Sequence, residues 1–133
     1  MPVADNRFDR EHVAEEIEDL GKSERGAVRS QIRRIVEHLL KLAHSSATAP
    51  RFDWMETMLD ARQTLSDKIS PTLRRDAEAV LDRLYPDGRK HAVASLLRYG
   101  ETAADALPTT CRYSLDDICR EDWYPDPPSG EQS

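Results

Sequence analysis

The feature that most constrains the fold is an apolar stripe between Ser23 and His44. A helix that carries one long apolar face is not stable alone in water, because most helical stability in proteins comes from burying that face. At 100° per residue, the apolar side chains of this segment fall within an arc of about 120°. The stripe therefore predicts a helix packed against other elements, with these core residues: Val28, Ile32, Ile35, Val36, Leu39, Leu42 and Ala43.

A shorter stripe precedes it. Val13, Ile17 and Leu20 recur at i, i+4 and i+7 and predict a helix that ends at Gly21, which is typical of a helix C-cap. Ser23 then reads as the N-cap of the next helix. If Gly21 is instead internal, the two stripes run nearly in phase and form one long helix. The sequence leaves both alternatives open.

Apolar stripes at helical spacing also follow the small, polar segment 45–50. They predict a helix to about Ile69, a helix that starts at Ser70-Pro71, a break at residues 85–88, a further helix ended by Gly100, and a short helix capped by Ser114. The apolar residues of these helices are Trp54, Met55, Met58, Ala61, Leu65 and Ile69; Leu73, Ala77, Val80, Leu81 and Leu84; Ala92, Val93, Leu96 and Leu97; and Leu115, Ile118 and Cys119.

These elements predict an all-α protein, an up-and-down bundle of five main helices plus a short C-terminal helix. A chain of 133 residues lies within the usual size of one domain. We expect that domain to cover residues 1–125, with a disordered tail at 126–133. Trp123 and Tyr124 follow the last helix, and we expect them to pack back on the bundle because two large aromatic side chains are costly to expose.

Charge and cysteine content favour a soluble cytoplasmic protein. The first residues are charged where a signal peptide needs an apolar core, and no apolar run approaches the roughly 18–20 residues of a membrane helix. Cys111 and Cys119 are too few for a disulfide scaffold and are expected to be reduced packing residues. The net charge of −6 argues against a chain built to coat nucleic acid.

The charges are unevenly distributed. Residues 5–20 carry seven acidic and two basic side chains, a balance of −5, whereas residues 22–44 carry six basic and two acidic side chains, a balance of +4. We expect these segments to form an antiparallel helical pair whose charges attract. Arg29 and Arg33 form a possible anion-binding stripe, but no aromatic residue interleaves them, so nucleic-acid binding is the weaker interpretation.

Arg62 lies in the middle of the apolar arc of its helix, so we expect it to be at least partly buried. A guanidinium cannot lose its charge there and needs a carboxylate or several carbonyl groups. Glu16, on the flank of the first stripe, is the expected partner, with Glu24 second. A structural ion pair is the preferred interpretation, and a ligand-binding arginine is the alternative.

The sequence contains only weak indications of a metal site or a catalytic site. His12 with Glu16, and Asp87 with His91, are spaced i, i+4, but no Glu stands three residues before a His as a di-iron bundle requires. No G-x-S-x-G elbow or glycine-rich phosphate loop occurs. We therefore predict no metal and no cofactor.

The runs VAEEIEDLGKSERGAVRSQIRRIVEHLLKL and CRYSLDDICREDWYPD resemble the bacterial family catalogued as domain of unknown function 29. The similarity spans residues 12–126, and EEIEDLGKSER and DWYP are its most specific parts. Gly26 departs from the pattern, since a charged helix former is expected there. The resemblance implies an all-helical bundle in the bacterial cytoplasm and carries no activity with it.

Taken together, these patterns favour a small helical protein-interaction module without catalytic activity, with a protein partner or self-association. Two alternatives remain. One is an enzyme with a carboxylate and histidine site in the bundle, which transition-metal content would reveal. The other is a nucleic-acid-binding protein that uses Arg29 and Arg33, which would bind in a steeply salt-dependent way.

Overall fold

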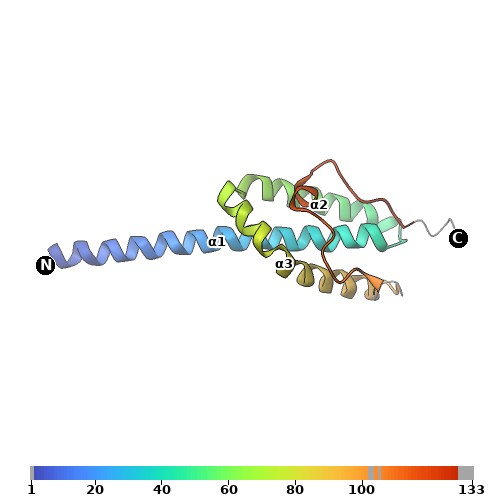
Figure 1. The fold of residues 1–133 in the computed structure, drawn as a ribbon, viewed down its shortest axis with the longest axis horizontal. Coiled ribbons are helices and arrows are strands. Elements are labelled where there is room, and N and C mark those ends of the chain that lie inside the picture. Colours follow the sequence, from blue (N-terminus) through green and yellow to red (C-terminus); the bar gives the residue numbers. More distant parts are fainter. Residues whose placement is uncertain (1, 102–103, 105, 129–133) are drawn as a thin grey trace.

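The computed structural model describes residues 2–101, 104 and 106–128, with side chains from residue 22 onward. Within this part of the chain there are no strands. Three long helices, α1 (Pro2–His44), α2 (Ala49–Lys68) and α3 (Pro71–Arg98), precede a short one, α4 (Leu115–Cys119). Short connections at 45–48 and 69–70 reverse the chain direction twice (Figure 1). The all-α prediction is confirmed, whereas the count of five main helices is wrong.

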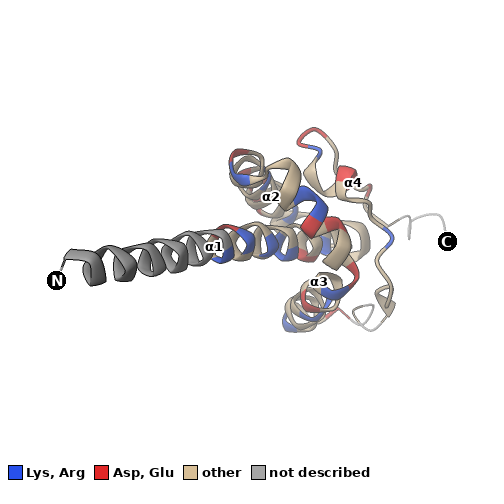
Figure 2. Ribbon diagram, turned by 60° about the vertical axis from the view of Figure 1, so that its left-hand side comes forward, with Lys and Arg blue, Asp and Glu red and all other residues tan. Residues whose placement is uncertain are grey.

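Helix α1 is the central element. It packs against both α2 and α3, which lie on either side of it (Figure 2). The apolar stripe predicted for this helix forms the middle of the core, and its large members are completely buried. They pack against Trp54, Met58 and Leu65 of α2 and Ala77, Leu84, Ala92 and Leu96 of α3 within one apolar cluster.

Helix α1 does not end at Gly21, so the second alternative left open by the sequence is the one observed. One glycine inside a helix costs only about 1 kcal/mol, so a single glycine does not by itself end a helix. In a continuous helix, residues 5–20 precede residues 22–44 along one axis. The predicted antiparallel pair of an acidic and a basic helix is therefore wrong.

Helix α3 likewise continues through Pro86, where the sequence predicted a break. Proline removes one backbone hydrogen bond, to the carbonyl of the residue four positions earlier, and strains the turn before it. Pro86 itself is exposed, whereas Leu84, Gly88 and Ala92 are buried at i, i+4 and i+8. Burial of this face on both sides of the proline holds the two predicted helices together as one.

Residues 106–128, which we call the C-terminal strap, cross the bundle and bury Leu107, Leu115 and Ile118 in its core (Figure 1). Ser114 begins α4 with a capping box, in which its hydroxyl accepts from the backbone N–H of Asp117 and the Asp117 carboxylate accepts from the backbone N–H of Ser114. Trp123 and Tyr124 are partly buried against the core, as predicted. The last residues of the predicted disordered tail, 129–133, lie outside the described part.

Helix α3 approaches α1 closely at Gly88. A Cβ atom added there would lie 2.7 Å from Cγ1 of Val36 and 2.9 Å from the backbone oxygen of Arg33. Because backbone cannot yield as a flexible side chain does, we expect Gly88→Ala to lower the free energy of unfolding by about 1–3 kcal/mol, the usual cost of overpacking a core. Urea denaturation followed by circular dichroism measures this change.

Gly26 provides the matched control, since it lies exposed in α1 and a Cβ added there meets nothing within 4 Å. Gly26→Ala should raise the free energy of unfolding by about 0.5–1 kcal/mol through the higher helix propensity of alanine. If both variants were stabilised, α1 and α3 would not approach each other as closely as described.

Candidate binding pocket

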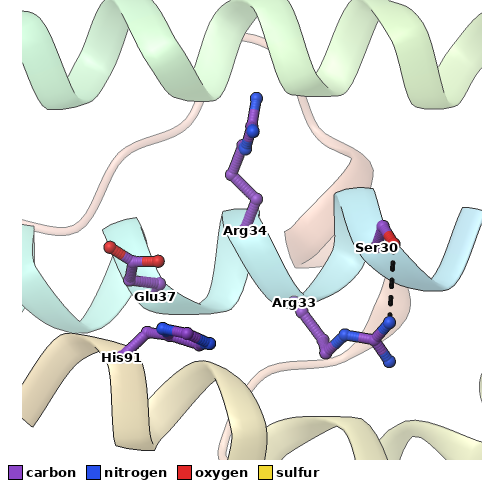
Figure 3. A pocket seen from close by; sticks show the side chains of 5 residues that line it. All are labelled: Ser30, Arg33, Arg34, Glu37 and His91. Carbon is purple, nitrogen blue, oxygen red and sulfur yellow. Dashed lines mark hydrogen bonds between the residues drawn. The ribbon is translucent and has the colours of Figure 1, made fainter. Parts of the chain in front are cut away.

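An open pocket of about 180 Å³ lies on the side of α1 that faces away from the core. Four of its lining residues come from α1 and the fifth, His91, comes from α3. Figure 3 shows Arg33 extending toward α3 and Arg34 extending toward α2, so that the two guanidinium groups lie on either side of this face of α1. We call this site the α1 pocket and define it by its lining: Ser30, Arg33, Arg34, Glu37 and His91.

The acidic member of the α1 pocket, Glu37, is neutralised by a buried lysine. Nζ of Lys41 lies 3.0 Å from Oε2 of Glu37 and also donates to the Ser95 hydroxyl at 3.3 Å. The same ammonium lies 5.1 Å from the ring centroid of Trp54, a cation–π contact. Contacts to α2 and α3 together therefore fix the lysine, which in turn holds the carboxylate.

The two arginines of the α1 pocket are not neutralised in this way. Among the side chains that the structure describes, no carboxylate lies within ion-pair distance of Arg33 or Arg34. Arg33 makes one long hydrogen bond, at 3.4 Å, to the Ser30 hydroxyl one turn earlier. Arg34 is exposed. The pocket thus presents two positive charges to solvent with hydrogen-bond donors unused, which is chemistry suited to an anionic partner.

The other arginine of the predicted anion-binding stripe, Arg29, has a partner. Its Nε and Nη2 donate to the two carboxylate oxygens of Asp76 on α3, at 3.1 and 2.8 Å. This bidentate pair raises the pKa of Arg29 and lowers that of Asp76, chiefly through the hydrogen bonds between them. Arg29 therefore ties α1 to α3, and it does not share an open site with Arg33.

Arg62 is buried, with 1% of its surface exposed, as its position in the apolar arc predicted. Its three nitrogens donate to backbone oxygens of the C-terminal strap: Nε to Ile118 at 2.8 Å, Nη1 to Trp123 at 2.6 Å and Nη2 to Asp117 at 2.9 Å. The guanidinium carbon also lies 5.4 Å from the Tyr124 ring centroid.

The expected carboxylate partners of Arg62 do not account for these contacts. The side chain of Glu16 falls outside the described residues, and Glu24 is exposed on α1. Two of the three carbonyl groups belong to the last turn of α4, where helix geometry leaves acceptors unsatisfied. Burial lowers the pKa of Arg62, but a guanidinium remains charged in any protein environment. Arg62 thus anchors the strap to α2.

Two other arginines hold the strap in the same way, and the sequence analysis did not single them out. Arg51 donates to the backbone oxygens of Leu42, at 2.8 Å, and Pro125, at 3.0 Å. Arg89 donates to those of Leu107 and Pro108. A backbone carbonyl exists at every position of every sequence, so no residue pattern identified these acceptors in advance.

The histidines and cysteines supply no assembled metal or nucleophile site in the part of the chain that is described. No group of three or more His, Cys, Asp and Glu side chains there could hold a metal ion. Of the two predicted metal-binding pairs, His12 with Glu16 lies outside the described side chains, and Asp87 and His91 are exposed. Burial raises the pKa of both the Cys111 and Cys119 thiols, which makes them poor nucleophiles.

Comparisons with known proteins identify one family. The model described as "Domain of unknown function DUF29" matches residues 4–124, which is most of the chain. No curated protein and no solved structure gives a significant match. None of the helices is long and apolar enough, over the residues described, to cross a bilayer.

The Arg62 contacts lead to a prediction about stability. Arg62→Met keeps the volume but removes the donor of three carbonyl groups. The Asp117 carbonyl keeps a long hydrogen bond from the Arg120 backbone N–H, at 3.4 Å, whereas those of Ile118 and Trp123 lose the side chain that binds them. Each buried acceptor left unsatisfied costs about 1–3 kcal/mol. We expect the free energy of unfolding to fall by roughly 3 kcal/mol or more, and the strap to become accessible to limited proteolysis. Arg83→Met, at an exposed position of α3, is the matched control. Equal stability of the two variants would contradict the anchoring role.

A second prediction concerns His38, a buried residue of α1. Its Nδ1 donates to the Arg34 carbonyl one turn earlier, at 2.8 Å. Burial lowers its pKa. The unfolded chain then binds a proton near pH 6.5 that the folded chain does not yet bind. The free energy of unfolding should therefore fall as the pH decreases below about 6.5, until the folded pKa is reached.

His38→Gln should make this pH dependence shallower between pH 7.5 and 5, as measured by urea denaturation. A residual slope is expected from His44, whose pKa is also lowered, by burial and by Arg112. His91→Gln, at an exposed position, is the control for loss of an imidazole. An unchanged slope in His38→Gln would contradict the assignment.

Proposed function

We propose, for a chain that belongs to the family of domain of unknown function DUF29, a role as a small helical protein-interaction module that binds an acidic segment of a partner at the α1 pocket. The observation that carries this proposal is a pair of guanidinium groups beside an open pocket on the central helix, the half-buried Arg33 and the exposed Arg34, with no carboxylate partner among the described side chains. We further propose that the domain acts in the cytoplasm.

The charge of the α1 pocket supports an anionic partner. Lys41 neutralises Glu37, so the lining keeps the two positive charges of Arg33 and Arg34. Charges placed at an interface speed association and exclude partners of like charge, and arginine in particular forms bidentate pairs with carboxylates. The pocket is open, which suits side chains presented by a protein segment better than an enclosed small molecule.

A nucleic acid is the weaker candidate. Phosphate binding needs several clustered cations along a backbone track, and Arg29 is committed to Asp76. No exposed aromatic residue lines the α1 pocket to stack a base. The overall charge of −6 also repels a polyanion at long range. An acidic protein segment places fewer charges on a smaller area and avoids this repulsion.

Fluorescence anisotropy of the full chain with a labelled synthetic helical peptide tests the proposal. The peptide carries glutamate on one face, and a peptide with lysine at the same positions is its control. We expect binding of the acidic peptide only. Arg33→Glu/Arg34→Glu should weaken it by roughly tenfold or more, since like charges at an interface cost several kcal/mol.

Arg83→Glu/Lys90→Glu makes the same change in net charge at two exposed positions of α3 outside the α1 pocket, and it should leave binding intact. Equal binding of both peptides, or equal loss in both protein variants, would overturn the proposal. A labelled single-stranded 20-mer in the same assay tests the alternative, because steeply salt-dependent binding of that probe alone would replace a protein partner with a nucleic acid.

A further inference from the structure

The two halves of α1 carry opposite net charges that do not contact each other within one copy of the chain. Residues 5–20 have a net charge of −5 and residues 22–44 have a net charge of +4, and both segments belong to one continuous helix. Opposite charges in successive parts of the same helix cannot face each other across a helix–helix contact. They can do so when a second helix of the same sequence lies antiparallel to the first.

The register of the charges fits this arrangement. Glu15 precedes Arg33, and Glu16 precedes Arg34, each by 18 residues. Since an α-helix has 3.6 residues per turn, 18 residues make five full turns, about 27 Å along the axis. The two acidic positions therefore have the same angular positions about the helix axis as the two arginines of the α1 pocket.

The positions between them form a regular seam. Steps of three and four residues, the spacing at which helices contact each other along their length, connect eight positions of α1. Two of them, Ser23 and Gly26, are small and exposed, which permits close approach of a second helix. Three members of the α1 pocket belong to the same seam, which runs through His12, Glu16, Asp19, Ser23, Gly26, Ser30, Arg33 and Glu37.

We propose that two copies of this chain associate through antiparallel α1 helices, so that the acidic segment, residues 5–20, of each copy occupies the α1 pocket of the other. This inference rests on the proposed function, of which it names the partner. In the two-fold symmetric register, Glu16 of one copy meets Arg33 of the other, and Glu15 meets Arg34. The same register brings Asp19 to Ser30, His12 to Glu37 and Ser23 to Gly26, with the symmetry axis between positions 24 and 25.

The two bundles of the proposed dimer lie on opposite sides of the symmetry axis. Arg29 already pairs with Asp76 near the start of α3, so α2 and α3 occupy the part of α1 on the C-terminal side of the symmetry axis. The symmetric operation places the second bundle on the other side of that axis. Each α1 pocket is then completed by residues of the partner copy. Because the paired groups are charged, the association should weaken with salt.

Charge exchange between the two segments tests the proposal. Sedimentation velocity of the full chain at low salt should give a mass near twice 15.1 kDa. Arg33→Glu/Arg34→Glu should be monomeric, as should Glu15→Lys/Glu16→Lys, because each variant opposes like charges in its own dimer. An equimolar mixture of the two variants should form a dimer again, since both contacts then join opposite charges. Arg83→Glu/Lys90→Glu should remain dimeric.

Circular dichroism of each variant separates loss of association from loss of folding. A monomeric native chain, a dimer that survives the Arg33/Arg34 reversal, or a mixture that stays monomeric would overturn the inference. The proposed function has its own readout in the Glu15→Lys/Glu16→Lys variant, whose α1 pocket is unaltered. If that variant binds the acidic synthetic peptide while the native chain is monomeric, the α1 pocket has a different acidic partner and only the dimer is wrong.

Discussion

Burial of a single helix face determines this structure. The apolar side of α1 lies between α2 and α3, and its large residues are inaccessible to water. Because one helix contacts both neighbours, the two flanking helices need only one apolar face each. The opposite side of α1 stays open, and the charged residues that cannot enter the core gather there. The α1 pocket is thus a consequence of how the core is assembled, with Gly88 setting how closely α3 can approach.

The sequence predicted the core better than it predicted the helix boundaries. Period-3.6 patterns identified most of the buried residues of the three long helices, because burial acts on every turn and leaves a repeated signal. Leu97 was wrongly assigned to an apolar face, since 53% of its surface is exposed. Pro86 was interpreted as part of a break and Gly21 as one of two alternatives, a helix end or an internal position, since local propensity disfavours both residues inside helices. Around Pro86, burial of Leu84, Gly88 and Ala92 outweighed that preference. The position of Gly88 indicates that α3 is continuous, because it extends the i+4 series of small and apolar residues from Leu84 to Ala92.

The candidate site was predicted in part. Arg33 belonged to the expected anion-binding stripe, whereas its neighbour Arg34 was missed. His91 was considered only as a possible metal ligand with Asp87, since membership in one pocket depends on how α3 lies against α1. The burial of Arg62 followed from its place in the apolar arc. Its acceptors did not, because the carbonyl groups of Asp117, Ile118 and Trp123 come from the backbone and are brought to α2 only by the path of the strap.

The anchoring of the strap also determines when the core can close during translation. The acceptors of Arg62 lie 55, 56 and 61 residues further along the chain. While these residues are still inside the ribosome, α1, α2 and α3 can assemble, but the guanidinium on α2 must stay hydrated and the core around it stays open. A nascent chain of this domain therefore completes its interior only after the strap has left the ribosome, and premature termination before α4 yields a product that remains open to quality-control proteases.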